Sequence, residues 1–180
     1  MPRLRLSSVR TVSVVIAMAL FTLSPVPGRA DVRLPAIFAD HMVVQQQSEI
    51  VVWGWAAPEE EVTVEASWGA KATATTGVHR GWRVRLETPA ADGAEHTLTV
   101  RGRTTETIHD VRIGEVWLAS GQSNMEMPVG DHGSGYRGVR DSAAEIDAAS
   151  HPDIRCFDVR NTIAASGRID CSGQWVPATP

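Results

Sequence analysis

The residues around Ser123 have the types and the spacing that could place a nucleophile. Residues 116–119 are four consecutive apolar side chains, which predicts a strand buried on both faces. Ser123 and Glu126 then have the S-x-x-E spacing of a capping box at the start of a helix. A hydroxyl at the carboxyl end of a strand, beside helical N–H groups that can bind an oxyanion, suits acyl transfer. From spacing alone, Ser123 is therefore either a nucleophile or only a helix cap.

The same segment resembles the first sequence block of the sialate O-acetylesterase family, a carbohydrate-esterase branch of the SGNH (GDSL-like) hydrolases. The similar residues are Gly114-Glu115-Val116-Trp117 and Gly121-Gln122-Ser123-Asn124-Met125-Glu126-Met127-Pro128. The general GDSL block has an aspartate before the serine, whereas this branch has a glutamine, as Gln122 is here. Residues 34–46 and 53–56 also resemble the N-terminal region of this family.

The resemblance implies a serine esterase that removes O-acetyl groups from sialic acid or a related acetylated sugar. It gives Ser123 the role of nucleophile and makes its backbone N–H one donor of the oxyanion hole. Gly121, Gln122 and Asn124 then support the site. The resemblance implies no cofactor and no metal, so the expected partner is the O-acetylated sugar itself.

The catalytic base of this family is a histidine in an Asp-x-x-His block near the C-terminus. The six histidines of this chain are preceded by no aspartate at that spacing; they are His41, His79, His96, His109, His132 and His151. Only His132, in the loop after the serine, is a candidate worth testing. We therefore expect a nucleophile without its base, and a chain that is inactive or nearly so as given.

Residues 111–180 have the pattern of strand, helix and strand. The helix is expected over residues 142–149, where S-x-x-E spacing recurs, and the second strand over residues 154–159. This order predicts a parallel α/β layer with Ser123 at the carboxyl end of its first strand. With the resemblance, it indicates the start of an incomplete three-layer α/β SGNH-hydrolase domain. Residues 171–180 resemble an internal segment of the family, so we expect a fragment.

Residues 31–110 form a different region, in which apolar and polar residues alternate with period two between turn residues. This pattern predicts a β-sandwich or jelly-roll-like module. Its tryptophans, Trp53, Trp55, Trp68 and Trp82, favour a packed core, with Trp68 the one most plausibly exposed for stacking on a sugar. The alternative function is accordingly a non-catalytic sugar-binding or interaction module with a vestigial esterase segment.

Residues 1–30 have the basic start, short apolar run and small residues near position 30 of a cleavable signal peptide. The apolar run, residues 11–21, is shorter than the roughly 20 residues of a membrane span. We therefore expect a secreted or periplasmic protein with no membrane association after cleavage. The formal net charge of −4 disfavours nucleic acid as a partner.

Two cysteines, Cys156 and Cys171, complete the set of candidate residues. In an oxidising compartment they could form a disulfide that closes a loop of about 15 residues, worth roughly 3 kcal/mol. The alternative is a pair of buried thiols. Neither cysteine has His, Cys or Asp at the spacing of a metal site, which argues against zinc.

Overall fold

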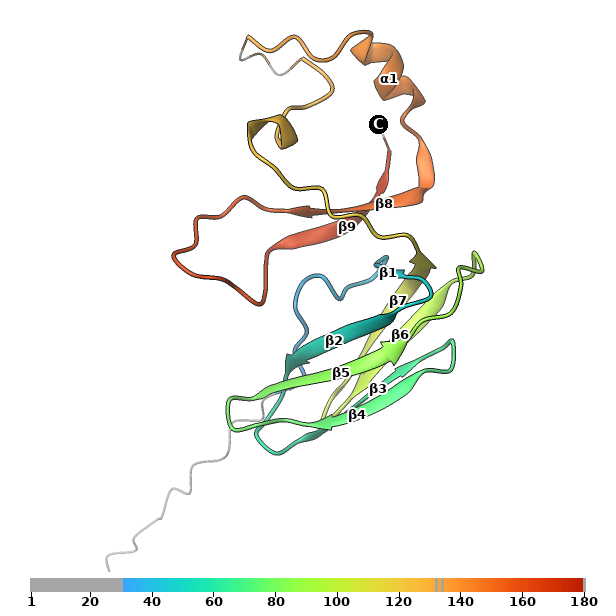
Figure 1. The fold of residues 1–180 in the computed structure, drawn as a ribbon, viewed down its shortest axis with the longest axis vertical. Helices are drawn as coiled ribbons and strands as arrows, with labels where there is room; N and C mark the ends of the chain where they lie inside the picture. The colour runs from blue at the N-terminus through green and yellow to red at the C-terminus, as the bar shows by residue number, and fades with distance from the viewer. Residues whose placement is uncertain (1–30, 132, 134, 180) are drawn as a thin grey trace, which may run out of the picture.

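The structure is a computed structural model that describes residues 31–131, 133 and 135–179, and it consists mostly of strands with few helices (Figure 1). The expected signal peptide, His132 and Pro180 lie outside these residues. No helix in the described ranges is both long and apolar enough to cross a membrane. The elements are β1 Val43–Gln45, β2 Glu49–Trp55, β3 Glu61–Ala66, β4 Lys71–Thr75, β5 Gly81–Glu87, β6 His96–Arg101, β7 Thr105–Gly114, the 3-10 helix η1 Ser123–Met125, α1 Ser142–Ala148, β8 His151–Val159 and β9 Gly173–Ala178.

Strands β1 to β7 form the β-rich module. Five of them make a mixed sheet in the order β1-β7-β6-β3-β4, in which β1 runs parallel to β7 and the other pairs are antiparallel. Strands β2 and β5 form a separate antiparallel pair. The expectation of a strand-rich N-terminal region is confirmed.

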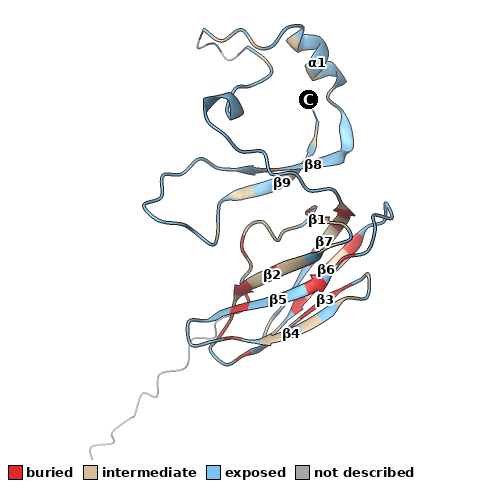
Figure 2. Ribbon diagram, viewed as in Figure 1, coloured by how far each residue is buried: buried red, intermediate tan, exposed pale blue. Residues whose placement is uncertain are grey.

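One hydrophobic core joins the five-stranded sheet to the β2–β5 pair (Figure 2). Alternate side chains of each strand point into it, because successive residues of a strand face opposite sides. Those with almost no exposed surface include Val52, Val62, Val64, Leu98, Val100 and Val111. The period-two pattern in the sequence is therefore the pattern of burial.

The tryptophans occupy three different environments. Trp82 is buried in the core. Trp53 and Trp55 are half-buried on the outer face of β2, because the residues that alternate with them, Val52 and Gly54, take the inward positions. Trp68 is half-buried against the core and its indole N–H donates to the carbonyl of Glu87 at 2.9 Å, so the expectation that it is exposed is wrong.

The region after β7 differs from the predicted parallel α/β layer. Helix α1 and strand β8 form where expected, but β8 pairs with β9 in an antiparallel hairpin. Residues 116–119 are not a strand, and the side chains of Trp117 and Leu118 are 87% and 93% exposed. An apolar run is buried only when strands flank it and other layers cover it. No described strand pairs with residues 116–119, so their side chains stay exposed.

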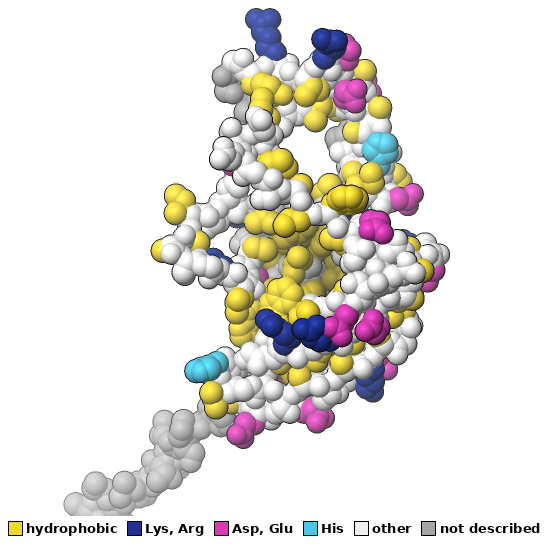
Figure 3. All heavy atoms as spheres, viewed as in Figure 1, with side chains coloured by type: hydrophobic (Ala, Val, Ile, Leu, Met, Phe, Trp, Pro, Cys, Tyr) yellow, Lys and Arg dark blue, Asp and Glu magenta, His cyan; other side chains and the backbone are white. Residues whose placement is uncertain are grey.

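The β8–β9 hairpin packs against the β-rich module. Apolar side chains gather over this junction (Figure 3). The indole N–H of Trp175 donates to the carbonyl of Ile37 at 2.8 Å, and that of Trp53 donates to the carbonyl of Ile169 at 3.2 Å. The Asp170 carboxylate accepts the backbone N–H of Ala36 at 3.0 Å.

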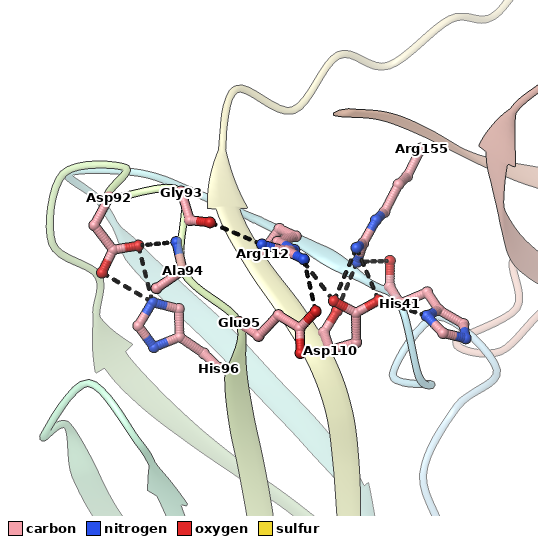
Figure 4. Close-up of polar contacts among 9 residues, drawn as sticks. All are labelled: His41, Asp92, Gly93, Ala94, Glu95, His96, Asp110, Arg112 and Arg155. Carbon is pink, nitrogen blue, oxygen red and sulfur yellow. Dashed lines mark hydrogen bonds and ion pairs between the residues drawn. The ribbon is translucent and has the colours of Figure 1, made fainter. Parts of the chain in front are cut away.

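Asp110 is the polar centre of the same junction (Figure 4). A bulge in β7 opposite β6 inserts one extra residue there, and Asp110 has a positive φ of 51°. The Arg155 guanidinium contacts both carboxylate oxygens at 2.9 and 2.8 Å, while His41 and Arg112 contact them at 2.7 and 3.1 Å. Burial raises the pKa of Asp110, but the hydrogen bonds from Arg155 and His41 outweigh it and lower this pKa from 3.8 to about 2.

Candidate active site

Ser123 begins a single 3-10 turn, and the predicted capping box is not formed. The backbone N–H groups of Met125 and Glu126 donate to the carbonyls of Gln122 and Ser123 at 2.9 and 3.1 Å. Gln122 occupies the N-cap position, with no side-chain cap. The Glu126 carboxylate instead accepts the side-chain amide of Asn161 at 2.7 Å. A helix-cap role for Ser123 therefore has no counterpart in this geometry.

The Ser123 hydroxyl is exposed to solvent. Within the described part of the chain it forms no hydrogen bond, and the backbone N–H of Ser123 is likewise without an acceptor there. The turn thus presents a hydroxyl and a backbone donor that no other described residue uses. These are the two groups that a serine nucleophile and an oxyanion site require.

The neighbouring candidates, Gly121, Gln122 and Asn124, lie in the same exposed turn. A Cβ atom at position 121 would lie 2.8 Å from Cγ of Met125, so glycine lets the Met125 side chain fold against the turn. Gln122 has an extended backbone, with φ −115° and ψ −148°, and directs the chain into η1. The four sequence-predicted residues are therefore one contiguous structural unit.

Glu115 anchors the start of the segment that leads to Ser123. Its carboxylate accepts the side-chain amides of Gln45 at 3.0 Å and Gln46 at 2.8 Å. The Gln45 side-chain carbonyl accepts the backbone N–H of Val116 at 2.8 Å. The hydrogen bonds from the two glutamines lower the pKa of Glu115 below its usual value. Sequence reasoning missed this contact, although residues 34–46 had already been singled out by the resemblance.

No described histidine hydrogen bonds to Ser123. His41 is held by Asp110, and His96 by Asp92 at 3.1 Å, both in the β-rich module. The remaining described histidines, His79, His109 and His151, are exposed. The one histidine considered as a base, His132, lies outside the described residues. Among the residues with a described position, no histidine accompanies the Ser123 hydroxyl as a base.

The two cysteines are free and exposed, so the structure does not pair them. Cys156 lies opposite Val176 in the β8–β9 hairpin. Cys171 lies two residues before the start of β9, next to Ser172, whose carbonyl accepts the backbone N–H of Arg160 at 2.8 Å. The paired chain from Ser172 to Val176 spans four residues, about 13 Å, so the two cysteines lie far apart along the hairpin. A disulfide requires Cα atoms within about 7 Å, so this hairpin cannot hold one.

Within the described ranges, no three His, Cys, Asp or Glu side chains converge to form a set of metal ligands. The chemistry that the turn itself offers is nucleophilic attack by a serine hydroxyl. An acyl group is the electrophile that this arrangement fits.

Comparisons with known proteins place the chain beside acetylesterases. The sialate O-acetylesterase of Rattus norvegicus is 31% identical over 153 residues, which cover 78% of this chain and 27% of that protein. The Mus musculus sialate O-acetylesterase is 32% identical over 139 residues, or 71% and 24%. No family model matches.

A solved structure agrees with these relatives. The crystal structure of a carbohydrate acetylesterase from Xanthomonas citri has 32% sequence identity and a TM-score of 0.71, covering 83% of this chain and 33% of that one. The present chain spans about a quarter of the length of the curated relatives and a third of this structure.

Proposed function

Because the chain belongs to the sialate O-acetylesterase family, of whose curated members it spans about a quarter, we propose that it carries the nucleophile segment of an exported carbohydrate esterase. The enzyme removes O-acetyl groups from sialic acid or a related acetylated sugar. The observation that carries this proposal is the turn at Ser123, whose hydroxyl is exposed and unused by a cap, in the segment that resembles the family's first block.

The reaction proceeds through a serine acyl-enzyme. The Ser123 oxygen attacks the acetyl carbonyl and its proton passes to a base, so that a tetrahedral oxyanion forms beside the Ser123 backbone N–H. Collapse of this intermediate breaks the bond to the sugar oxygen, which leaves protonated. Water then attacks the acetyl-serine, releases acetate and restores the hydroxyl. Each well-placed oxyanion donor contributes about 3 kcal/mol to such a reaction.

The fold assignment that accompanies this function has two parts. The β-rich module is the sandwich or jelly-roll-like module that precedes the esterase domain. Residues 115–180, which follow β7, are the N-terminal part of a three-layer α/β SGNH domain. The boundary predicted between residues 110 and 111 falls inside β7, because Val111 and Ile113 are buried in the core of the module. The support for this division is the likeness to the Xanthomonas citri structure together with the change from a buried core to exposed elements after β7.

The mature chain by itself, residues 31–180, hydrolyses aryl acetates at or near the background rate, because no described histidine reaches Ser123. Hydrolysis at enzymatic rates that Ser123→Ala abolishes would contradict this expectation.

A chimera tests the role of Ser123 directly. In it, residues 31–180 replace the matching segment of the Xanthomonas citri esterase, which supplies the rest of the enzyme. We expect acetate release from acetylated sugars, and a loss of at least about a thousandfold in kcat with Ser123→Ala. Ser120→Ala, another exposed serine of the same segment, is the matched control and retains activity. A folded chimera in which Ser123→Ala costs no more than Ser120→Ala would overturn the proposal.

A further inference from the structure

Gln45 and Gln46 of the β-rich module contact the start of residues 115–123, the nucleophile segment. We infer that Gln45, with Gln46, is a positioning residue for Ser123. The inference rests on the proposed function. It gives the β-rich module a supporting part in the reaction, because the module then fixes the path of residues 115–123.

The contact is a clamp of four hydrogen bonds, which we call the Gln45–Gln46 clamp. The two side-chain amides donate to different oxygens of the same carboxylate, Glu115 Oε2 and Oε1, at 3.0 and 2.8 Å. The Gln45 side-chain carbonyl takes the Val116 N–H at 2.8 Å, so one side chain binds both a side chain and the backbone. The backbone N–H of Gln46 donates to the carbonyl of Gly114 at 2.8 Å.

The position of the clamp follows from the sheet. Strand β1 runs parallel to β7, and Gln45 lies opposite Gly114, the last residue of β7. The glutamines therefore act at the point where the chain leaves the module. Because 70 residues separate Gln45 from Glu115 in the sequence, this support comes from the fold and not from local structure.

Beyond the Gln45–Gln46 clamp, residues 117–125 form no side-chain hydrogen bond to a distant described residue. Residues 115–129 are all exposed. Figure 1 shows this stretch leaving the end of β7, crossing the β8–β9 hairpin in this view and reaching η1 on the side of the hairpin away from the module. The next side-chain hydrogen bond to a distant described residue is the one from Asn161 to Glu126. Ser123 thus lies between two anchor points, and the first of them is the clamp. Displacement of a reacting group by about 1 Å can cost two orders of magnitude in rate, so such an anchor bears on catalysis.

The variant Gln45→Met tests the clamp, because methionine keeps the length of the side chain and removes both hydrogen bonds. Gln47→Met is the matched control, since Gln47 is exposed and its side chain has no hydrogen bond to a described residue. The chain contains six tryptophans, and Trp117 lies two residues beyond Glu115. Incorporation of 5-fluorotryptophan therefore gives a signal from the segment, assigned with Trp117→Phe, and another from the core at Trp82.

In the mature chain, we expect Gln45→Met to raise the amide exchange rate of Val116 about tenfold and to shift and narrow the Trp117 fluorine signal. The Trp82 signal and the urea midpoint stay within error of the parent, and Gln47→Met changes none of these. An unchanged Val116 exchange rate would overturn the inference. A Gln45→Met variant whose urea midpoint falls while its Trp117 fluorine signal shifts would also overturn the inference, because Gln45 would then only stabilise the module. Gln45→Ala repeats the test if the methionine variant does not fold.

The chimera separates this inference from the proposed function. A kcat about tenfold lower in Gln45→Met, with KM within twofold, supports positioning. An unchanged kcat beside a Ser123-dependent reaction refutes positioning and leaves the esterase assignment intact. A chimera that lacks Ser123-dependent activity refutes the esterase assignment, whereas Val116 exchange in the mature chain still decides whether the clamp exists.

Discussion

Arg155 holds the β8–β9 hairpin on the β-rich module, and Arg155→Ala should loosen this contact by a measurable amount. The guanidinium donates to both carboxylate oxygens of Asp110 and to the backbone carbonyls of Asp110 and His41, at 2.6 to 2.9 Å. Its side chain is only 10% exposed. The variant therefore removes four hydrogen bonds and one charge from a largely buried place.

The expected cost is about 2 kcal/mol. Loss of one partner from a fully buried ion pair costs about 3 to 5 kcal/mol. Here 22% of the Asp110 side chain is exposed, and its carboxylate keeps His41 and Arg112 as partners, so the cost lies nearer that of a hydrogen bond to a charged group. With a urea dependence of about 2 kcal/mol per molar, the midpoint falls by about 1 M.

Urea unfolding followed by the fluorine signal of 5-fluoro-Trp175 measures this effect, because Trp175 lies in the hairpin and contacts the module. Arg160→Ala is the control, since Arg160 is an exposed arginine of the same hairpin region. The Asp110→Asn variant completes a double-mutant cycle, and asparagine tolerates the positive φ at that position. Arg155 does not hold the hairpin if Arg155→Ala lowers the midpoint no more than Arg160→Ala does, or if the effects of Arg155→Ala and Asp110→Asn are additive.

Three further outcomes follow from the described contacts. The folded-state pKa of Asp110, about 2, lies below its usual 3.8, so its stabilisation is present above pH 4 and is lost as the pH falls toward 2; acid titration of stability should show a shallower loss in Asp110→Asn. Glu60→Ala should lower the free energy of unfolding by about 2 to 3 kcal/mol in urea melts. The reason is that the buried Glu60 carboxylate accepts two backbone N–H groups, which would lose their acceptor. The control Glu59→Ala, at an exposed neighbour, should cost under about 0.5 kcal/mol. A thiol reagent should titrate both Cys156 and Cys171 in folded residues 31–180, whereas their absence from the titration would indicate the disulfide that the hairpin geometry excludes.

The β-rich module could be predicted from the sequence because its signal is local. Alternation along single strands, as in residues 81–87, reports directly which side chains face the core. The pairing of strands is not local. That β1 joins β7 in parallel, or that a bulge turns Asp110 toward Arg155, depends on residues 45 to 70 positions apart.

The candidate site could be predicted only in part, for a related reason. The turn at Ser123 could be predicted because Ser120 and Gly121, which favour turns, follow the apolar run of residues 116–119. The burial of residues 116–119 was wrongly predicted, because burial depends on what packs against a segment and four apolar residues do not encode their neighbours. The Gln45–Gln46 clamp was missed because polar side chains that reach across 70 residues leave no periodic pattern.

Trapping of the acyl-enzyme would show directly whether Ser123 is the nucleophile. The chimera is quenched during turnover of an acetylated sugar and digested, and the peptide that contains Ser123 is examined by mass spectrometry. We expect an acetyl group on Ser123 that disappears on hydroxylamine treatment and is absent from Ser123→Ala. Steady release of acetate with no acetyl group on Ser123, or with an acetyl group on a different residue, would contradict it.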